Sequence, residues 1–308
     1  MEIISGLEYL KSDRRCAVTI GTFDGLHLGH KKIIEKLNNI ASEKNLCSTL
    51  LTFDPHPKIV LKQSDDFHIA ILTTLDEKKK ILTEMGINRL VVIEFNRAFA
   101  SQSYEQFVKH VLIEKIGAQA IVVGYDHAFG KDRKGNFDNL KLLCDRYSFD
   151  LHKVDPIEIN GEIISSSLIR RAISEGDVVA AGKYLGRYYS YSGKVIPGDS
   201  RGKGLHFPTA NIYNSNQNKQ IPASGVYAVD VVYKDSTYKG MLNIGNRPTF
   251  GLRGDYTIEV HIHNFDNEIY NENLTVFFKK RLRNEIKFDS VDALVAQLEI
   301  DKQNSLKL

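Results

Sequence analysis

The chain has 308 residues, 42% of them hydrophobic, which predicts about two domains with ordinary apolar cores. Its formal net charge of +3 is too small to favour a nucleic-acid partner on charge alone. Three widely spaced cysteines (Cys16, Cys47 and Cys144) form no disulfide or metal framework, and no apolar run approaches the ~18 residues of a membrane span, so we expect a soluble cytoplasmic protein.

The first half alternates short apolar runs with amphipathic segments, from residue 16 to about 155. Strands are predicted at residues 17–20, 47–53, 89–95, 119–124 and 149–154. Helices are predicted over residues 76–86 and 103–117, the second opened by a capping box of Ser103 and Gln106. This alternation predicts a parallel α/β sheet that binds its ligand at the carboxyl ends of the strands.

The second half changes to β-rich stretches punctuated by turns, which predict a small antiparallel barrel. Its expected strands are residues 188–195, 225–233, 237–244, 256–262 and 274–278. The chain closes with a predicted helix from residue 290 to about 304. The apolar stripe of that helix consists of Val291, Leu294, Val295 and Leu298. We place the two domains at residues 1–184 and 185–308.

The motif GTFDGLHLGH, residues 21–30, connects the first predicted strand to an amphipathic helical pattern. A helix N-terminus offers unpaired N–H groups and a positive dipole end, and glycines let a phosphate approach the backbone. His27 and His30 are one helical turn apart, so both imidazoles can face that phosphate and stabilise charge during transfer. The alternatives are two surface histidines, or a metal site that includes Asp24.

A second candidate phosphate-binding element is ISSSLIRR, residues 164–171, where serines cap a predicted helix. Arg170 can contact a phosphate through two parallel hydrogen bonds, although an ordinary capped helix with a surface arginine is the alternative. Two further motifs follow predicted strands. The prolines of TFDPHP, residues 52–57, fix a rigid loop, and in GYDHAFG, residues 124–130, Asp126 could bind a ribose or a magnesium ion.

GTFDGLHLGH together with ISSSLIR resembles the signature pair of the nucleotidylyltransferase superfamily. With TFDPHP and GYDHAFG added, the first half looks like the FMN adenylyltransferase module of bacterial bifunctional riboflavin kinase/FAD synthetases, a Rossmann-like domain. Two residues depart from the family pattern. Ser167 replaces a frequent threonine and keeps the hydroxyl, and His127 replaces a common phenylalanine and so bears on the shape of the pocket.

The resemblance implies roles for particular residues of this first half. His27, His30 and Arg170 would stabilise the α-phosphate of ATP and the leaving pyrophosphate. ATP binding is implied for Gly21, Phe23, Asp24, Gly25, Gly29, Ser165, Ser166 and Ser167. Binding of the flavin or the nucleotide is implied for Phe53, Pro55, His56 and Asp126.

Residues 193–211, GKVIPGDSRGKGLHFPTAN, combine four glycines with the basic Arg201 and Lys203. We expect a flexible cationic loop that suits nucleotide phosphates and is not a Walker loop. Thr209 and Asn211 then supply the neutral oxygen ligands that Mg²⁺ accepts, unless PTAN is a plain turn. Glu259, in the alternating segment YTIEVHI, is either a solvent-facing strand residue or a base at the mouth of the barrel.

PTAN, the glycine-rich loop, the NIGNRPTF segment and the Glu259 strand together look like the riboflavin kinase domain of the same enzymes. The resemblance implies that Thr209 and Asn211 hold the magnesium–ATP complex. Glu259 would take the proton from the ribityl 5′-hydroxyl that attacks the γ-phosphate. His206 replaces the usual glycine, and a positive φ there would strain the chain and weaken the kinase.

The same resemblance implies further binding residues in the second half. ATP binding is implied for Gly193, Lys194, Gly198, Arg201, Gly202, Lys203 and Pro208. Flavin binding is implied for Arg283, Glu285 and Phe288.

The resemblance covers nearly the whole chain and predicts a bifunctional enzyme of FAD biosynthesis, a monomer or weak homo-oligomer that uses Mg²⁺ with ATP. Its partners would be riboflavin, FMN and ATP, with no nucleic acid and no membrane. One alternative is an FAD synthetase whose barrel binds flavin but turns it over poorly. Others are a non-catalytic flavin- or nucleotide-sensing protein, and transfer to another acceptor such as phosphopantetheine or nicotinamide mononucleotide, which the second domain disfavours.

Overall fold

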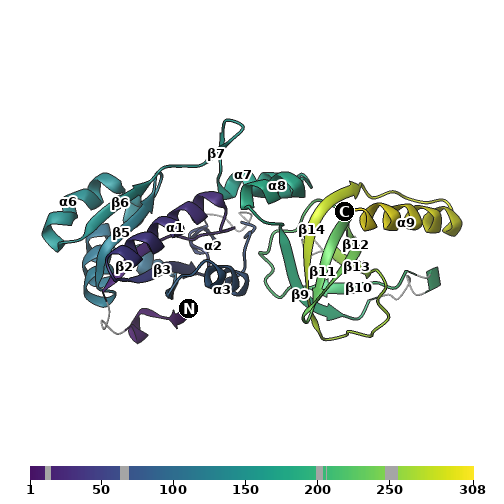
Figure 1. Ribbon diagram of the computed structural model, residues 1–308, viewed down its shortest axis with the longest axis horizontal. Coiled ribbons are helices and arrows are strands. Elements are labelled where there is room, and N and C mark those ends of the chain that lie inside the picture. The colour runs from purple at the N-terminus through teal and green to yellow at the C-terminus, as the bar shows by residue number, and fades with distance from the viewer. Residues whose placement is uncertain (11–14, 63–68, 199–203, 206, 247–255) are drawn as a thin grey trace. The chain divides into compact units, whose positions relative to one another are not determined.

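The computed structural model describes residues 1–10, 15–62, 69–198, 204–205, 207–246 and 256–308. Contacts within the chain divide it into two compact units, Met1–Ser166 and Ser167–Leu308. The first unit contains a parallel sheet and the second a closed antiparallel barrel, so the predicted fold class is confirmed (Figure 1). No helix in these described ranges is both long and apolar enough to cross a membrane.

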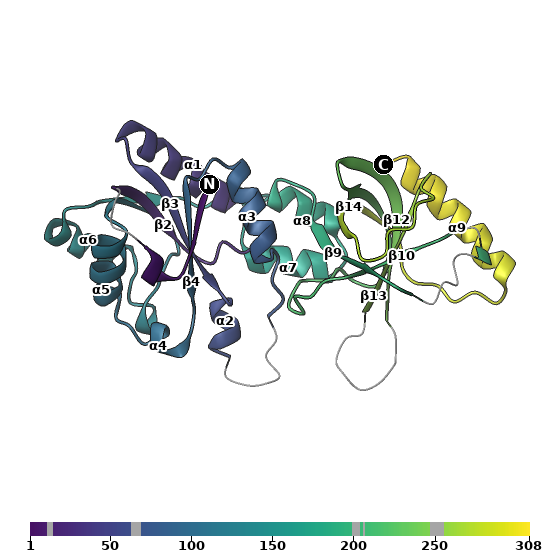
Figure 2. The same cartoon turned by 90° about the horizontal axis from the view of Figure 1, so that it is seen from below.

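Six parallel strands form the sheet of the first unit, in the order β1-β4-β3-β2-β5-β6. Figure 2 labels β2, β3 and β4 of this sheet. The strands are β1 (Glu2–Ser5), β2 (Cys16–Ile20), β3 (Cys47–Asp54), β4 (Arg89–Glu94), β5 (Ala118–Gly124) and β6 (Asp150–Val154). The helices and turns around them are η1 (Leu7–Tyr9), α1 (Leu28–Glu43), α2 (Pro57–Val60), α3 (Leu75–Glu84), α4 (Arg97–Ala100), α5 (Tyr104–Phe107), η2 (Val108–Lys115), η3 (Lys131–Arg133) and α6 (Phe137–Tyr147).

Alternate residues of the central strands belong to two different apolar cores. On β2, Ala17 lies in the core that contains Leu37 of α1, whereas Val18 lies in the core that contains Val111 of η2 and Leu140 of α6. Helices therefore cover both faces of the sheet, which explains why the central strand β2 is buried at every residue rather than at alternate ones. The carboxyl ends of β2, β3 and β5 are left to carry the loops predicted to bind ligands.

Two capping boxes begin helices where the sequence contains a hydroxyl residue followed three positions later by Glu or Gln. Ser103 and Gln106 form the predicted box at α5, and the helix continues as the π-helical η2 before it ends at Gly117, with φ 72°. A second box, formed by Thr74 and Glu77, begins α3 one residue before the predicted start. Each box satisfies backbone N–H groups that the first turn cannot bond internally.

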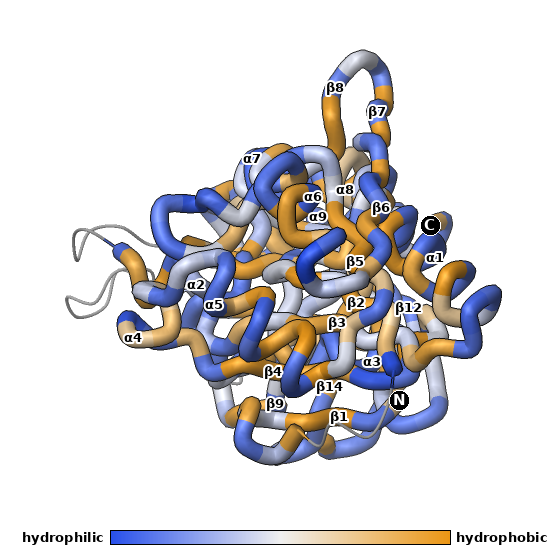
Figure 3. The backbone as a smooth tube through the Cα atoms, turned by 90° about the vertical axis from the view of Figure 1, so that its left-hand side faces the viewer, coloured by the Kyte–Doolittle hydropathy of each residue, from blue (hydrophilic) through white to orange (hydrophobic). Residues whose placement is uncertain are grey.

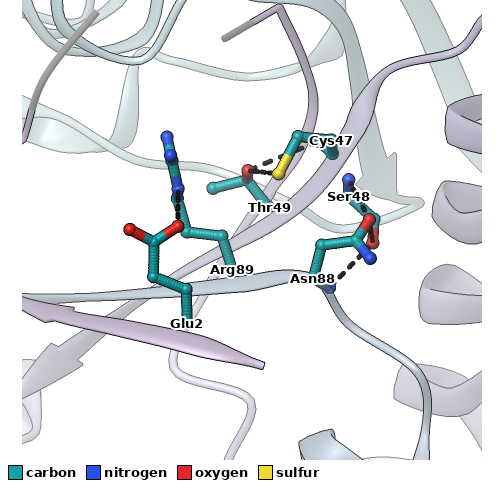
Figure 4. Close-up of polar contacts among 6 residues, drawn as sticks. All are labelled: Glu2, Cys47, Ser48, Thr49, Asn88 and Arg89. Atoms are coloured by element: carbon teal, nitrogen blue, oxygen red, sulfur yellow. Dashed lines mark hydrogen bonds and ion pairs between the residues drawn. The ribbon is translucent and has the colours of Figure 1, made fainter. Parts of the chain in front are cut away.

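β1 was not predicted, because its four residues are mostly exposed and show no apolar period. The strand is held at the sheet edge by an ion pair across its register: Glu2 and Arg89 are paired residues, and Arg89 Nε donates to Glu2 Oε2 at 3.0 Å (Figure 4). The Arg89 side chain is only 2% exposed, so Glu2 supplies a counterion to a buried charge.

A short hairpin, β7 (Glu158–Ile159) and β8 (Glu162–Ile163), projects from the first unit (Figures 1 and 3). Its turn consists of Asn160 and Gly161, with φ 54° and 79°. The Asn-Gly pair favours a two-residue turn in which both φ angles are positive, and this pair is the signal in the sequence that predicts the hairpin.

The second unit contains a closed barrel with the strand order β10-β13-β12-β11-β14-β9. Its strands are β9 (Ser190–Ile196), β10 (Ala210–Tyr213), β11 (Gly225–Tyr233), β12 (Ser236–Asn246), β13 (Tyr256–Ile262) and β14 (Asn273–Arg283). The five predicted strands are confirmed. β10 was missed because the sequence reasoning placed its first two residues in the glycine-rich loop.

Two short helices precede the barrel, α7 (Ser166–Ser174) and α8 (Val178–Leu185), and almost all of their residues belong to the second unit. The Ala223 N–H donates to the Ile173 carbonyl at 3.3 Å, and Arg281 Nη1 donates to the Glu175 carbonyl at 3.4 Å. The contacts therefore divide the chain at the start of these helices. The domain boundaries expected from the sequence, residues 1–184 and 185–308, stay a prediction.

The closing helix α9 (Val291–Leu306) is confirmed, but its buried residues are polar. Val291, expected in the apolar stripe, is 61% exposed, whereas Asp301 and Ser305 are buried. The Asp301 carboxylate accepts hydrogen bonds from Arg283 Nε at 2.9 and 3.1 Å and pairs with Nη2 at 2.8 Å. α9 is therefore joined to β14 by a buried ion pair, which an apolar pattern does not reveal.

We expect Asp301→Ala to lower the free energy of unfolding by about 3–5 kcal/mol, because it leaves the Arg283 guanidinium desolvated without its counterion. Urea unfolding monitored by circular dichroism measures the change. Glu299→Ala removes an exposed carboxylate from the same helix and should cost less than about 0.5 kcal/mol. Equal losses of stability in the two variants would contradict a stabilising role for the Asp301–Arg283 ion pair.

Candidate active sites

The histidine loop, residues 21–30, follows β2 and leads into α1. His27 is the N-cap of α1, and its Nδ1 accepts a hydrogen bond from the His30 N–H at 3.4 Å. The two imidazole rings stack with centroids 3.7 Å apart, and the Phe23 ring lies 4.9 Å from His30. The two histidines expected together are therefore in contact at the start of a helix.

The backbone of this loop is strained. Phe23 and Leu26 have φ angles of 45° and 42°, which are unfavourable for residues with a side chain, and Gly25 has φ 88°. Both non-glycine side chains are buried, at 3% and 0% exposure. Burial of these apolar side chains offsets the backbone cost.

Asp24 supports the loop through its carboxylate. The side chain is 2% exposed, and its oxygens accept the Leu72 N–H at 2.9 and 3.1 Å and the Thr73 N–H at 3.1 Å. The Asp24 carbonyl accepts the Ser166 hydroxyl at 2.8 Å. These bonds give Asp24 a structural role in the loop, and its contact with ATP stays a prediction. No cluster of three or more His, Cys, Asp or Glu residues that could hold a metal ion occurs in the described part of the chain.

The glycines of the loop make room for aromatic rings. A Cβ on Gly29 would lie 3.2 Å from the His27 ring, and a Cβ on Gly21 would lie 3.2 Å from the Phe23 ring. Both distances are shorter than ordinary van der Waals contact. Small residues at these two positions therefore allow the ring packing around His30.

The ISSSLIRR motif begins α7. Ser166 is its first residue and bonds to the histidine loop, and Ser165 directly before it is half-buried. Ser167 and Arg170 follow in the part of α7 that belongs to the second unit. Their predicted contact with ATP stays a prediction.

A continuous run of aromatic rings connects the TFDPHP and GYDHAFG motifs. Centroid distances along it are 5.9 Å from Phe53 to Phe99, 5.7 Å to Phe107, 5.2 Å to Phe129 and 5.4 Å to His127. Offset and edge-on ring contacts of this length are favourable. The run gives the first unit an apolar aromatic wall beside the ends of β3 and β5.

Three other residues of these two motifs, Pro55, His56 and Asp126, lie at the same end of the sheet. Pro55 and His56 follow β3 directly, and His56 caps α2 by accepting the Lys58 N–H on Nδ1 at 3.1 Å. Asp126 is exposed just after β5. Their flavin or nucleotide contacts stay predictions.

In the second unit, three polar residues are paired across neighbouring strands. Glu259 of β13 is in register with Asn211 of β10 on one side and with Asn243 of β12 on the other. Residues next to them, such as Val260 and Leu242, are fully buried, so this polar row lies on the opposite face from the apolar interior. The sequence analysis missed Asn243, because only the register brings it beside Glu259.

Thr209 joins this polar row just before β10. Its hydroxyl donates to Glu259 Oε2 at 3.5 Å, and the Asn211 amide packs against Gly198 so closely that a Cβ there would clash. A hydroxyl, an amide carbonyl and a carboxylate are hard oxygen donors, which is the ligand chemistry that Mg²⁺ prefers. The residues present therefore fit a magnesium–nucleotide complex.

His261 fixes the segment before Thr209. Its Nδ1 lies 2.8 Å from the Pro208 carbonyl, which only accepts, so Nδ1 carries the proton that is shared. Burial lowers the pKa of His261, although the hydrogen bond to Pro208 counters this, and Lys302 adds to the lowering. A neutral ring thus ties residue 208 to β13, two positions from Glu259. Sequence reasoning gave His261 no role.

A pocket opens beside this segment of the barrel. Its lining is mostly apolar, with Thr209, Asn267 and Glu268 as polar members. Residues that line it include Val195, Pro208, Thr209, Val260, Ile269 and Tyr270.

The glycine-rich loop is shorter than expected. Gly193 and Lys194 lie within β9, and a Cβ on Gly193 would clash with the Tyr213 carbonyl, so this glycine permits close strand pairing rather than loop mobility. The expectation of a loop at these two residues is therefore wrong. Arg201, Gly202, Lys203 and His206 lie outside the described residues, as do residues 247–250 of the NIGNRPTF segment.

Of the three residues expected to bind flavin in the barrel, Arg283 is engaged with Asp301, and its guanidinium carbon lies 5.8 Å from the Phe288 ring centre. Glu285 is exposed, and its Oε1 lies 3.0 Å from where a Cβ on Gly245 would stand. Arg283 thus has a structural role, and the flavin contacts stay predictions.

Comparison with known proteins matches both halves. The family model described as FAD synthetase matches residues 10–168, and the model described as riboflavin kinase matches residues 185–308. A Listeria monocytogenes bifunctional riboflavin kinase/FMN adenylyltransferase is 37% identical, covering 96% of this chain and 92% of that protein. Proteins with the same name from Bacillus subtilis and Escherichia coli are 36% and 33% identical over 95% and 98% of this chain.

The chain belongs to the bifunctional riboflavin kinase/FMN adenylyltransferase family. A crystal structure from Streptococcus pneumoniae, described as a macrolide-efflux protein, also matches over 100% of both chains with a TM-score of 0.91 and 32% identity. The histidine loop lies in the matched FAD synthetase segment, and the Asn211–Glu259–Asn243 row lies in the matched riboflavin kinase segment.

His127 stands where the sequence resemblance leads us to expect a phenylalanine, and its environment explains how the imidazole ring is accommodated. Burial, and secondarily the charge of Arg133, lowers the pKa of His127 to about 4. The imidazole is therefore neutral at physiological pH and packs 5.4 Å from Phe129 as another aromatic ring would.

We expect His127→Phe to remove part of the acid sensitivity of the first unit. Between pH 6.5 and pH 4 the unfolded chain binds a proton at this residue that the folded chain does not, so stability falls with decreasing pH by up to about 1.4 kcal/mol per unit. Thermal unfolding at several pH values, with His110→Phe as the exposed control, measures this. An unchanged pH dependence in His127→Phe would refute it.

Proposed function

We propose that this chain phosphorylates riboflavin to FMN in residues 185–308 and adenylylates FMN to FAD in residues 1–184, using ATP in both reactions. The observation that carries the proposal is the presence of both matched segments, in order, in one chain. Relatives with both activities in their names match along almost the entire chain at 33–37% identity. A single-activity enzyme or a sensor is therefore not favoured.

For adenylyl transfer, the FMN phosphate attacks the α-phosphorus of ATP, the bond to the β-phosphate oxygen breaks, and pyrophosphate leaves. The attacking phosphate is already ionised at neutral pH, so no general base is needed. Because His27 Nδ1 accepts from the His30 N–H, the neutral His27 ring carries its proton on Nε2 and can donate it to a phosphate oxygen. His27, His30 and Arg170 would stabilise charge on the phosphates.

For the kinase reaction, Glu259 would accept the proton of the ribityl 5′-hydroxyl as its oxygen attacks the γ-phosphorus and ADP leaves. The Thr209 hydroxyl, 3.5 Å from Glu259 Oε2, orients that carboxylate. Thr209 and Asn211 would hold Mg²⁺ with the nucleotide, and the bound cation supplies charge neutralisation at the phosphates.

We also propose a cytoplasmic location for the enzyme. All three cysteines are free thiols, as expected of a protein in the reducing cytoplasm, and we place the enzyme there. A monomer or weak homo-oligomer that binds neither nucleic acid nor membrane completes the proposal.

The test is incubation of the intact chain with riboflavin and magnesium–ATP, followed by separation of the flavins. Formation of FMN and then FAD supports the proposal. FAD formation from supplied FMN alone would leave only the synthetase. Stoichiometric flavin binding without product would leave a sensing protein.

His30→Ala should lower kcat for FAD formation from FMN by about 10²–10³-fold, because it removes a donor to the transition-state charge. Riboflavin phosphorylation by the same protein should be unchanged. The exposed His110 of the first unit provides the control substitution to alanine. Equal loss of both activities would argue against separate sites.

Glu259→Gln should lower the rate of FMN formation by about 10²–10⁴-fold, because the amide cannot accept the hydroxyl proton. FAD formation from supplied FMN should be retained. Glu272→Gln, at an exposed position before β14, is the matched control. Full kinase activity in Glu259→Gln would remove this carboxylate from the mechanism.

A further inference from the structure

Lys78 is a buried lysine that the reaction described above does not use. It lies on α3, is 6% exposed, and reaches the carboxyl ends of β2 and β3. Its Nζ donates to the Thr22 carbonyl at 2.7 Å and to the Thr52 hydroxyl at 2.9 Å. The Thr52 hydroxyl also lies 3.2 Å from the Thr22 carbonyl, so these three groups form a closed hydrogen-bonded triangle.

A buried ammonium needs compensation. Burial lowers the pKa of Lys78 to about 8, while the carboxylates of Asp24 and Asp54 act in the opposite direction. At neutral pH the group therefore stays mostly charged, and its hydrogen bonds are charge-assisted and stronger than neutral ones. A charge retained at a desolvation cost indicates that the contacts it makes matter.

These contacts lie at the start of the histidine loop, directly after β2. The Thr22 carbonyl belongs to the peptide bond that leads into Phe23, the first residue of positive φ, at 45°. The Phe23 ring lies 4.9 Å from the His30 ring, which stacks on His27 at 3.7 Å. Rotation of the Thr22–Phe23 peptide would move the Phe23 ring away from His30.

The same short segment of the chain supports the loop twice. The backbone N–H groups of Leu72 and Thr73 bind the Asp24 carboxylate, and Lys78 on the following helix binds the Thr22 carbonyl. The Thr74–Glu77 capping box fixes the start of that helix. Phe23 is thus held from both sides by one rigid element.

We propose that Lys78 is a positioning residue for adenylyl transfer, which sets the placement of His30 through the Thr22 carbonyl and the Phe23 ring. The inference rests on the proposed adenylyl transfer at the histidine loop. Lys78 touches no reacting group in this scheme. Its loss would shift the imidazole pair relative to the phosphates, whereas substrate binding elsewhere in the site would persist.

The test is steady-state kinetics of the intact chain carrying Lys78→Met, which keeps the length of the side chain and removes the donor. We expect kcat for FAD formation from FMN to fall by about 10–100-fold, as small misplacements at a reacting centre do, with little change in either KM. Riboflavin phosphorylation should be unchanged. Lys80→Met, exposed on the same helix, is the matched control and should behave as wild type.

A spectroscopic readout separates positioning from general destabilisation. In histidine-labelled protein, Lys78→Met should shift the ring-proton NMR signals of His30, identified by their absence in His30→Gln. The signals of the exposed His110 should stay in place. Unmoved His30 signals, a kcat within error of wild type, or parallel loss of both activities would each overturn the proposal.

If Lys78→Met does not fold, Thr52→Val provides the test. This substitution removes the hydroxyl of the hydrogen-bonded triangle without changing the charge. A reduced kcat with unchanged KM supports the proposal, and full adenylyl transfer refutes it. Absence of FAD formation by the wild-type chain would refute the proposed function instead, so the two failures are distinguishable.

Discussion

Buried hydrogen bonds hold the histidine loop in a backbone conformation that the local sequence alone would not retain. Phe23 and Leu26 both have positive φ, and each such residue costs of order 1 kcal/mol or more. Burial of the two side chains offsets part of this cost, and the Asp24 carboxylate, bound to the Leu72 and Thr73 N–H groups, adds to the compensation. The stacked imidazoles depend on this constraint, because His30 packs on the Phe23 ring.

In the barrel, the strand register fixes the positions of the site residues. Glu259 is flanked by Asn211 and Asn243 because β10, β13 and β12 pair in one register, and His261 two residues along ties the Pro208 carbonyl to the same strand. A slip of one residue would move every one of these side chains to the other face. The site is therefore as fixed as the sheet itself.

Local patterns predicted the regular elements well, and polar burial accounts for the main failures. Capping residues and apolar runs located α3, α5 and β2–β6, because these signals act within a few residues. The unpredicted strand β1 carries the ion pair of Glu2 with Arg89. Helix α9 was predicted, but its buried face carries the pair of Asp301 with Arg283 instead of the expected apolar stripe. Such contacts join polar residues that are distant in the chain, so hydrophobic periodicity does not predict them.

The sequence by itself determined the family, the order of the two domains, and the residue types at each site, because the motifs are contiguous and their chemistry is local. The tertiary structure decided which side chains lie together. Asn243 is paired with Glu259 across two strands, and the Lys78 amine donates to the Thr22 carbonyl. It also decided that the Asp24 carboxylate binds the Leu72 and Thr73 N–H groups and so supports the histidine loop. Register and burial arise from pairing across the chain, and no short stretch of sequence encodes them.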